Sequence, residues 1–449
     1  MSNHNNISKG FDWSIIWLYI FLVIIGVSMI FANEYKEGES IIQPILSQSR
    51  DYGKQVLWVG VCTVLATFIL LTDSKFFTAT ANLLYGFGIF LCILALLIGT
   101  EVKGSKSWIV LGGFRLQPSE LTKVFTCLAL AKYISRQETD FSKMNSHLIG
   151  AAIALAPAIV TIAQNETGLA LVYFSFFLVM YREGLPPFIL IAGASMAVLL
   201  ILSLILAPQT LLISFTVFAA LALLFSRRQF RRKPVIFWGI IALWGFASFV
   251  SAFAIPYGIN KVMKPYQRDR LYSLVGKPYI PQDSLERAEL EISKASKKSG
   301  SRNQSEYNVI QSKIAIGSGG LFGKGWLNGS QSHLHFLPEH STDFIFAACG
   351  EEFGFIGSII LIALFMFVVI RGLIITINAQ DTFTRLLAGS LTLTFFVSFF
   401  VNMGMVTGIV PVVGIPLPLI SYGGSSMVTL MASFGILMSI QTHRKLLTT

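Results

Sequence analysis

Runs of about twenty apolar residues recur from one end of the chain to the other, and each can cross the ~30 Å hydrocarbon layer of a membrane as an α-helix. Of the 449 residues, 54% are hydrophobic and only 13% are charged, a balance that no soluble core can bury. The sequence therefore predicts an all-α polytopic membrane protein with about 10–12 transmembrane helices.

Hydropathy places the individual spans. The expected spans lie near residues 13–32, 55–71, 76–99, 119–135, 147–164, 168–181, 187–207, 211–225, 236–256, 353–370, 386–410 and 427–440. The first run is longer than a signal-peptide core and lacks a small-residue cleavage site, so we expect it to be retained. The cysteines lack the spacing of a metal site or a disulfide framework and are expected to be small buried residues: Cys62, Cys92, Cys127 and Cys349.

Basic residues in short loops indicate the orientation, because Lys and Arg collect on the cytoplasmic side. The densest cluster comprises Arg227, Arg228, Arg231, Arg232 and Lys233, and a second one, His443-Arg444-Lys445, closes the chain. With twelve spans both clusters and both termini are cytoplasmic. The net charge of +11 then comes from Lys and Arg residues that lie near the anionic headgroups of membrane lipids. Nucleic acid is therefore not expected as a partner.

Three segments are too long for tight turns and map to the outer side: 100–118, 257–342 and 411–426. Loops of this length are usually functional or disordered. We expect one transmembrane domain over residues 1–449, with a long extracytoplasmic loop at 257–342. Its polar stretch 277–306, rich in Lys, Glu and Ser, is interpreted as a solvated insertion.

The Gly-rich segment 311–326 is flanked by Lys313 and Lys324. A nucleotide-binding Walker A loop needs Gly-Lys-Ser/Thr, whereas Gly325 follows Lys324 here, so nucleotide binding is rejected. Two interpretations remain: a backbone that approaches an anionic or sugar ligand closely, or a loop that only needs tight turns.

Two groups of charged residues lie at the edges of apolar runs on the outer side. In the first, Glu339 and Asp343 precede an apolar helix, and Asp343 is either a helix cap or a functional acid held where water is scarce. In the second, Arg115 precedes Glu120 and Lys123, which are three residues apart and can pair on one helix face. Such a pair is either functional or structural.

The motifs at 115–123, 311–325, 338–343 with Glu351-Glu352, and 411–426 (PVVGIPLPLISYGGSS) together resemble the signature of the SEDS family (shape, elongation, division and sporulation), above all its rod-shape members. The resemblance covers nearly the whole chain. It implies a bacterial plasma-membrane glycosyltransferase that polymerises lipid II, working with a class B penicillin-binding protein and other elongation-complex proteins. The family's essential Asp aligns on Asp343, and its Glu/Lys pair on Glu120 and Lys123.

The chain departs from the family pattern at three places. Ser341 stands where a His is common, and Gln164-Asn165-Glu166 replaces the usual Gln-Pro-Asp. An additional hairpin is expected around 187–225. The polar residues at 164–168 interrupt two apolar runs and predict a broken helix that lines a cavity.

The resemblance implies an inverting transfer in which Asp343 is the general base and undecaprenyl pyrophosphate leaves. The residues expected to bind substrate are Arg115, Glu120, Lys123, Lys313, Lys324 and Glu339. No cofactor is required because the donor is already activated, although a divalent cation, Mg²⁺ or Mn²⁺, is compatible with the chemistry. A lipid II flippase and a non-catalytic scaffold of the cell-wall complex remain as alternatives.

Overall fold

The computed structural model describes residues 12–35, 42–102, 105–111, 114–227, 234–263, 267–268, 271–272, 304–334 and 336–448. Within these ranges, ten helices are long and apolar enough to cross a membrane. They are α1 (Trp13–Glu34), α3 (Asp51–Leu70), α4 (Ser74–Ile98), α6 (Met144–Ala163), α9 (Pro187–Ile205), α10 (Pro208–Phe225), the helix Pro234–Lys261 that starts with α12 (Pro234–Phe249), α18 (Ile345–Asn378), α19 (Thr382–Thr407) and α20 (Gly424–Thr448). The predicted multi-span helical fold is confirmed.

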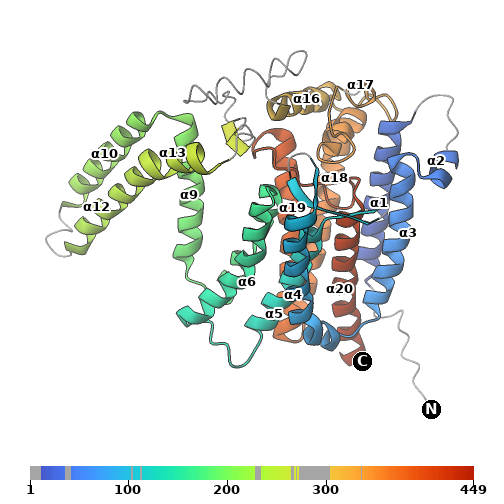
Figure 1. Cartoon of the computed structure of the whole chain (residues 1–449), viewed down its shortest axis with the longest axis horizontal. Helices are drawn as coiled ribbons and strands as arrows, with labels where there is room; N and C mark the ends of the chain where they lie inside the picture. Colours follow the sequence, from blue (N-terminus) through green and yellow to red (C-terminus); the bar gives the residue numbers. More distant parts are fainter. Residues whose placement is uncertain are drawn as a thin grey trace. The chain divides into compact units, whose positions relative to one another are not determined.

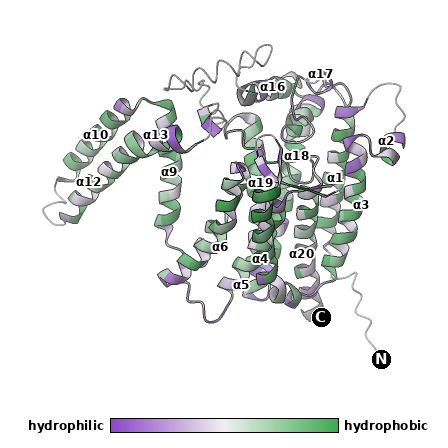
Figure 2. Ribbon diagram, in the orientation of Figure 1, coloured by the Kyte–Doolittle hydropathy of each residue, from purple (hydrophilic) through white to green (hydrophobic). Residues whose placement is uncertain are grey.

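Two of the twelve expected spans are shorter than the rest. One is α5 (Pro118–Ile134), which begins with a proline at its first turn, where the missing N–H costs nothing. The other is divided into α7 (Thr167–Tyr173) and α8 (Phe176–Arg182). Figure 2 shows the long helices as mostly hydrophobic, with hydrophilic residues near their ends and in the connections.

The chain forms two compact units, one comprising Met1–Leu185 and Asn308–Thr449, the other Pro186–Tyr307. In the first, α5 packs against α4, α6, α19 and α20, and α20 also packs along α3 (Figure 1). Small residues allow these helices to approach closely. A β-carbon on Gly372 of α18 would lie 2.3 Å from Thr392 Oγ1 of α19, and one on Gly435 of α20 would lie 2.9 Å from the Ala66 carbonyl oxygen of α3.

The first unit also contains a small antiparallel sheet that the all-α prediction did not include. Its strands are β1 (Thr100–Val102), β2 (Ser105–Leu111) and β3 (Phe114–Leu116), in the order β1-β2-β3. Val110 pairs with Arg115, so the sheet carries Arg115 directly into α5. Three short helices complete the unit: α2 (Ile42–Ser47), most of α16 (Gln304–Ser318), and α17 (Ser330–His333).

The two helices expected to form an additional hairpin, α9 and α10, are both present in the second unit, but α10 packs mainly against α12 (Figure 1). The last helix continues through η2 (Val250–Ala254), α13 (Ile255–Tyr257) and η3 (Gly258–Val262), so the span ends later than expected. Its buried cluster is small and comprises Leu204, Val250, Ile255, Ile259 and Leu271. Most of the polar insertion at 277–306 and the basic residues 228–233 lie outside the described residues.

The expected outer loop 257–342 contains regular structure. Residues 304–318, which include half of the Gly-rich segment, form α16, and tight turns begin only at Gly319. The four cysteines are free and buried, as expected.

Candidate active site

Asp343 lies in the turn before α18, and a side chain from another helix holds its backbone. Asn402 of α19 is fully buried, and its Nδ2 donates to the carbonyl oxygens of Asp343 at 2.9 Å and Ile415 at 2.7 Å. The N-cap of α18 is Phe344. Asp343 therefore lies one residue before the N-cap position, and its interpretation as a functional acid stays a prediction.

The irregular segment 411–423 binds the turn that carries Asp343. The Tyr422 amide donates to the Ser341 carbonyl oxygen at 2.8 Å, and Ser421 Oγ donates to the Thr342 carbonyl oxygen at 2.6 Å. Both contacts are to backbone carbonyls of the turn, so they do not depend on which side chains stand at 341 and 342.

Glycines bring this segment close to its neighbours. Gly414 has a φ of +71°, and a β-carbon there would lie 3.6 Å from Asp343 Oδ2, so its backbone borders the carboxylate. A β-carbon on Gly168 would lie 2.2 Å from the Val413 carbonyl oxygen. Gly168 follows the break between α6 and α7, where Asn165 has a φ of +70°. The predicted helix break is confirmed, and it lies against the 411–423 segment.

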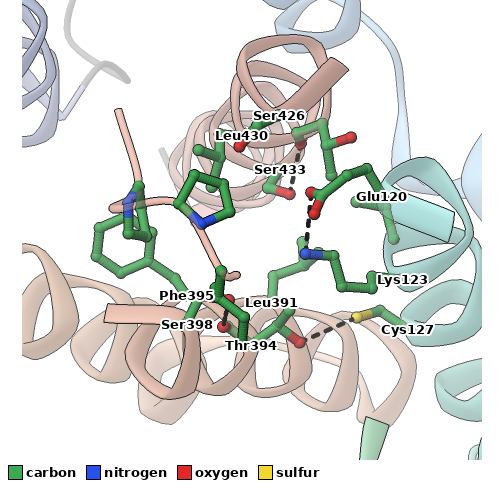
Figure 3. Close-up of a pocket in the computed structure, with 15 residues that line it drawn as sticks. Glu120, Lys123, Cys127, Leu391, Thr394, Phe395, Ser398, Ser426, Leu430 and Ser433 are labelled. Atoms are coloured by element: carbon green, nitrogen blue, oxygen red, sulfur yellow. Dashed lines mark hydrogen bonds and ion pairs between the residues drawn. The ribbon is translucent and has the colours of Figure 1, made fainter. Parts of the chain in front are cut away.

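Glu120 and Lys123 form the predicted ion pair, with 2.9 Å between Glu120 Oε2 and Lys123 Nζ. Their side chains are 4% and 6% exposed, so both charges lie inside the bundle. Figure 3 shows the pair between α5, α19 and α20, beside Thr394 and Ser433. Ile415, whose carbonyl Asn402 binds, lines the same pocket. The ion pair and Asp343 are therefore connected through one short loop.

This pocket is small, about 30 Å³, and has room for water but not for a diphosphate in the described conformation. The role of Glu120 and Lys123 in substrate binding stays a prediction.

Arg115 lies in β3 with an exposed side chain. Its carbonyl oxygen accepts a hydrogen bond from Ser425 Oγ at 3.0 Å, and the same Oγ accepts from the Gln117 amide at 3.0 Å. The start of α20 thus anchors the start of α5. Burial and the nearby Asp51 carboxylate raise the pKa of Tyr422 to about 12, and the positive charge of Arg115 partly opposes them. Arg115 therefore lies near the segment that binds the Asp343 turn.

The two lysines of the Gly-rich segment have different surroundings. Lys324 Nζ lies 2.5 Å from Glu351 Oε1 and 2.7 Å from Ser330 Oγ. Lys313 is exposed on α16 beside Gly408, the left-handed residue that ends α19, where a β-carbon would lie 2.7 Å from Lys313 Nζ. A positive charge is favourable at a helix C-terminus. These contacts give each lysine a structural role, and binding of a substrate by either lysine stays a prediction.

A polar cavity of about 340 Å³ lies beside the Asp343 turn, within the size range of ligand pockets, roughly 300–1,000 Å³. All ten lining residues carry hydrogen-bonding side chains: Asn33, Glu34, Tyr35, Arg50, Asp51, His333, Glu339, His340, Ser341 and Thr342. Of these, only Glu339 was predicted from the sequence to be a site residue. Glu339 Oε2 accepts from Thr342 Oγ1 at 2.9 Å.

Several lining residues were missed because they are far from the motifs in sequence. Glu34 ends α1 and its Oε2 accepts from the Asp51 amide at 2.9 Å at the start of α3. Asn33 Nδ2 donates to the His340 carbonyl oxygen at 3.1 Å. A usable signal existed, since Glu34 and Asp51 are acids at the ends of apolar runs, as Asp343 is. Among the described residues, no three His, Cys, Asp or Glu side chains form a metal-binding group.

Fold and site together define a multi-span membrane protein with an acid-bearing polar site at one end of its helix bundle. A family model for FtsW, RodA and SpoVE, described as "Cell cycle protein", matches residues 12–239 and 232–446. The chain belongs to this family.

Curated relatives match over nearly the full length. The chain is 34% identical over 444 residues to the peptidoglycan glycosyltransferase MrdB of Escherichia coli (strain K12), covering 99% of this chain and 98% of that protein. It is also 34% identical over 461 residues to the peptidoglycan glycosyltransferase RodA of Treponema pallidum (strain Nichols), covering 97% and 98%. The stage V sporulation protein E of Bacillus subtilis (strain 168) is 27% identical, covering 97% of this chain.

Solved structures share the fold. One chain from a structure described as "Structural coordination of polymerization and crosslinking by a peptidoglycan synthase complex" has a TM-score of 0.64 and 22% identity, covering 97% of this chain and 98% of that one. The rod shape determining protein RodA of Thermus thermophilus has a TM-score of 0.59 and 21% identity, covering 99% of both chains.

Proposed function

We propose that this protein is a peptidoglycan glycosyltransferase that polymerises lipid II into glycan strands, with Asp343 as the general base. The observation that carries the proposal is the arrangement of Asp343. Its backbone is bound by Asn402, and its Oδ2 is bordered by Gly414. The relatives named above as peptidoglycan glycosyltransferases support the class of reaction.

The reaction needs one base. Lipid II carries its disaccharide-peptide on undecaprenol through a pyrophosphate, which is a good leaving group without protonation. Asp343 takes the proton from the 4-hydroxyl of the acceptor sugar while that oxygen bonds to C1 of the donor. The bond from C1 to the pyrophosphate breaks, and attack from the opposite face turns an α-linked donor into a β-linked product.

A positive field stabilises the departing undecaprenyl pyrophosphate. Arg115 is the best placed candidate, because its side chain is exposed next to the segment that binds the Asp343 turn. Lys123 would contribute positive charge from inside the bundle, where it is paired with Glu120. We propose that no cofactor is required, since Arg115 and Lys123 provide charge. A divalent cation, Mg²⁺ or Mn²⁺, is the alternative source.

The protein would work in the bacterial plasma membrane during cell elongation, with both termini in the cytoplasm and with a class B penicillin-binding protein as partner. A structural relative comes from a complex described as coordinating polymerization and crosslinking, which supports a crosslinking partner.

Purified protein mixed with lipid II in detergent tests the activity, because polymerisation needs no second compartment whereas flipping does. The wild type should produce glycan polymer. The Asp343→Asn protein keeps the size of the side chain but cannot accept the proton, and polymer formation should fall by ~10²-fold or more. Near-normal polymer yield from a folded Asp343→Asn protein would contradict the role of Asp343, and Glu339 would be the next acid to test.

A further inference from the structure

Glu351 and Glu352 are adjacent, fully buried acids on α18 with opposite surroundings. Glu351 accepts hydrogen bonds from Lys324, Ser330 and the Gln331 amide, at 2.5, 3.1 and 2.9 Å. Neither carboxylate oxygen of Glu352 has a hydrogen-bond partner among the described residues. A buried carboxylate without partners is costly, so the surroundings of Glu352 need an explanation.

His333 of α17 forms an ion-pair contact with Glu352. His333 Nε2 lies 3.9 Å from Glu352 Oε1, and this nitrogen is itself buried without a hydrogen-bond partner. The Leu327 amide acts on Glu352 electrostatically but does not reach hydrogen-bond geometry. A small movement of the ring, or one bridging water, joins the two groups.

His333 also lines the polar cavity. Its side chain is 24% exposed, and it is one of the ten residues that line the cavity. When one ring nitrogen of a histidine carries its proton toward a carboxylate, the other nitrogen of the neutral ring is an acceptor. With Nε2–H directed at Glu352, Nδ1 is left to accept a hydrogen bond from a ligand.

The cavity has the chemistry of a carbohydrate site. Every lining side chain can form hydrogen bonds, and the carboxylates of Glu34, Asp51 and Glu339 accept from hydroxyl groups. Three acids against the single cation Arg50 disfavour a diphosphate there, whereas a sugar offers hydroxyl donors to acids and to imidazole alike. The cavity wall includes Thr342, the residue before Asp343, so a bound sugar lies next to the proposed base.

We propose that this cavity binds one sugar unit of the glycan, with His333 as a substrate-binding residue that accepts a hydroxyl hydrogen bond at Nδ1 and with Glu352 as the positioning residue that orients its ring. The identity of the sugar, an N-acetylated unit of lipid II or of the growing strand, rests on the proposed function. The binding of a saccharide does not.

The first experiment separates binding from turnover. His333→Leu removes the acceptor, and the lipid II concentration for half-maximal rate (KM) should rise roughly three- to tenfold, with kcat little changed, since one hydrogen bond is lost. His333→Gln supplies an amide oxygen and should restore most of the loss. His443→Leu is the control, because His443 lies near the C-terminal end of α20. The site lies by the N-terminal end, roughly 30 Å away along a helix that rises 1.5 Å per residue. An unchanged KM in His333→Leu, or no recovery in His333→Gln, would overturn the proposal.

A double-mutant cycle tests Glu352. Glu352→Gln keeps the volume, but its amide can either accept from Nε2–H or donate to Nε2, so it no longer selects the ring tautomer that leaves Nδ1 as an acceptor. KM should therefore rise in the wild-type background and stay unchanged when His333 is already Leu. If Glu352→Gln has the same effect on KM in both backgrounds, Glu352 acts on the fold and not through His333. Should Glu352→Gln not fold, the two His333 variants still decide the question.

Saturation-transfer NMR with the lipid-free disaccharide N-acetylglucosaminyl-N-acetylmuramic acid makes the test independent of activity. The wild type should show binding that His333→Leu weakens. Binding without polymer formation from lipid II would refute the proposed function and keep the sugar site. Polymer formation with equal disaccharide binding in wild type and His333→Leu would refute the sugar site and keep the proposed function.

Discussion

Asn402 on α19 donates to the carbonyl oxygen of Asp343, at 2.9 Å, so the amide holds the backbone of the proposed base from another helix. The same Nδ2 binds the Ile415 carbonyl oxygen at 2.7 Å. One side chain therefore sets the distance between the Asp343 turn and the segment that borders its carboxylate. Since Asn402 is fully buried, no water replaces it without a structural change.

Replacing Asn402 should reduce turnover more than stability. Asn402→Ala removes both hydrogen bonds and frees the Asp343 turn, and we expect kcat to fall about tenfold to a hundredfold, the scale on which small misplacements act. The measurement is the polymerisation rate from lipid II, with thermal unfolding as a check on folding. Thr407→Val on the same helix is the control, because the Thr407 hydroxyl donates to the Met403 and Gly404 carbonyl oxygens of its own helix. Equal losses of rate in both variants would contradict a specific role for Asn402.

The close approach at Gly319 should tolerate no side chain. A β-carbon there would lie 2.1 Å from the Gly350 carbonyl oxygen, whereas one on Gly317 meets no atom within 4 Å. We expect Gly319→Ala to destabilise the protein by about 1–3 kcal/mol, as overpacking does. Gly317→Ala, at the end of α16, should be neutral or stabilising, because alanine favours a helix. Thermal unfolding of the two variants in one detergent checks this, and equal midpoints would show that the Gly319 contact is absent in solution.

The predicted orientation can be tested by labelling. Cysteine at Gln229 should resist a membrane-impermeant thiol reagent added outside, while cysteine at Ser301 should react. Both positions lie outside the described residues, so the prediction rests on the basic cluster around Gln229. The native cysteines are all buried, which keeps the background low and makes the unmodified chain a suitable control. Outside labelling at Gln229 would overturn the twelve-span topology.

The sequence predicted those features that depend on local pattern. The apolar runs predicted the helices, and the spacing of Glu120 and Lys123 predicted their ion pair, because residues three apart share a helix face. The break after Gln164 was also local, since polar residues interrupt an apolar run.

Features that depend on tertiary packing were not predictable in the same way. Asn402 lies in an apolar run and nothing nearby in sequence indicates that its partner is 59 residues away. Glu34 and His333 meet in one cavity from opposite parts of the chain. The sheet was missed because its strands are only 3, 7 and 3 residues long. Such strands depend on their pairing partners more than on their own propensity.

The Glu120–Lys123 pair offers the sharpest separation of a structural role from a functional one. Both side chains are almost fully buried, so Lys123→Ala alone leaves an uncompensated charge and should cost about 3–5 kcal/mol of stability. The charge swap Glu120→Lys with Lys123→Glu keeps a buried pair at the same spacing. We expect the swapped protein to fold, measured by thermal unfolding, and to lose polymerisation if the positive charge must lie at position 123 to stabilise the leaving pyrophosphate. Stability recovered together with full activity would show that the pair only holds α5 in the bundle, and Arg115 would then be the main cation left to bind the pyrophosphate.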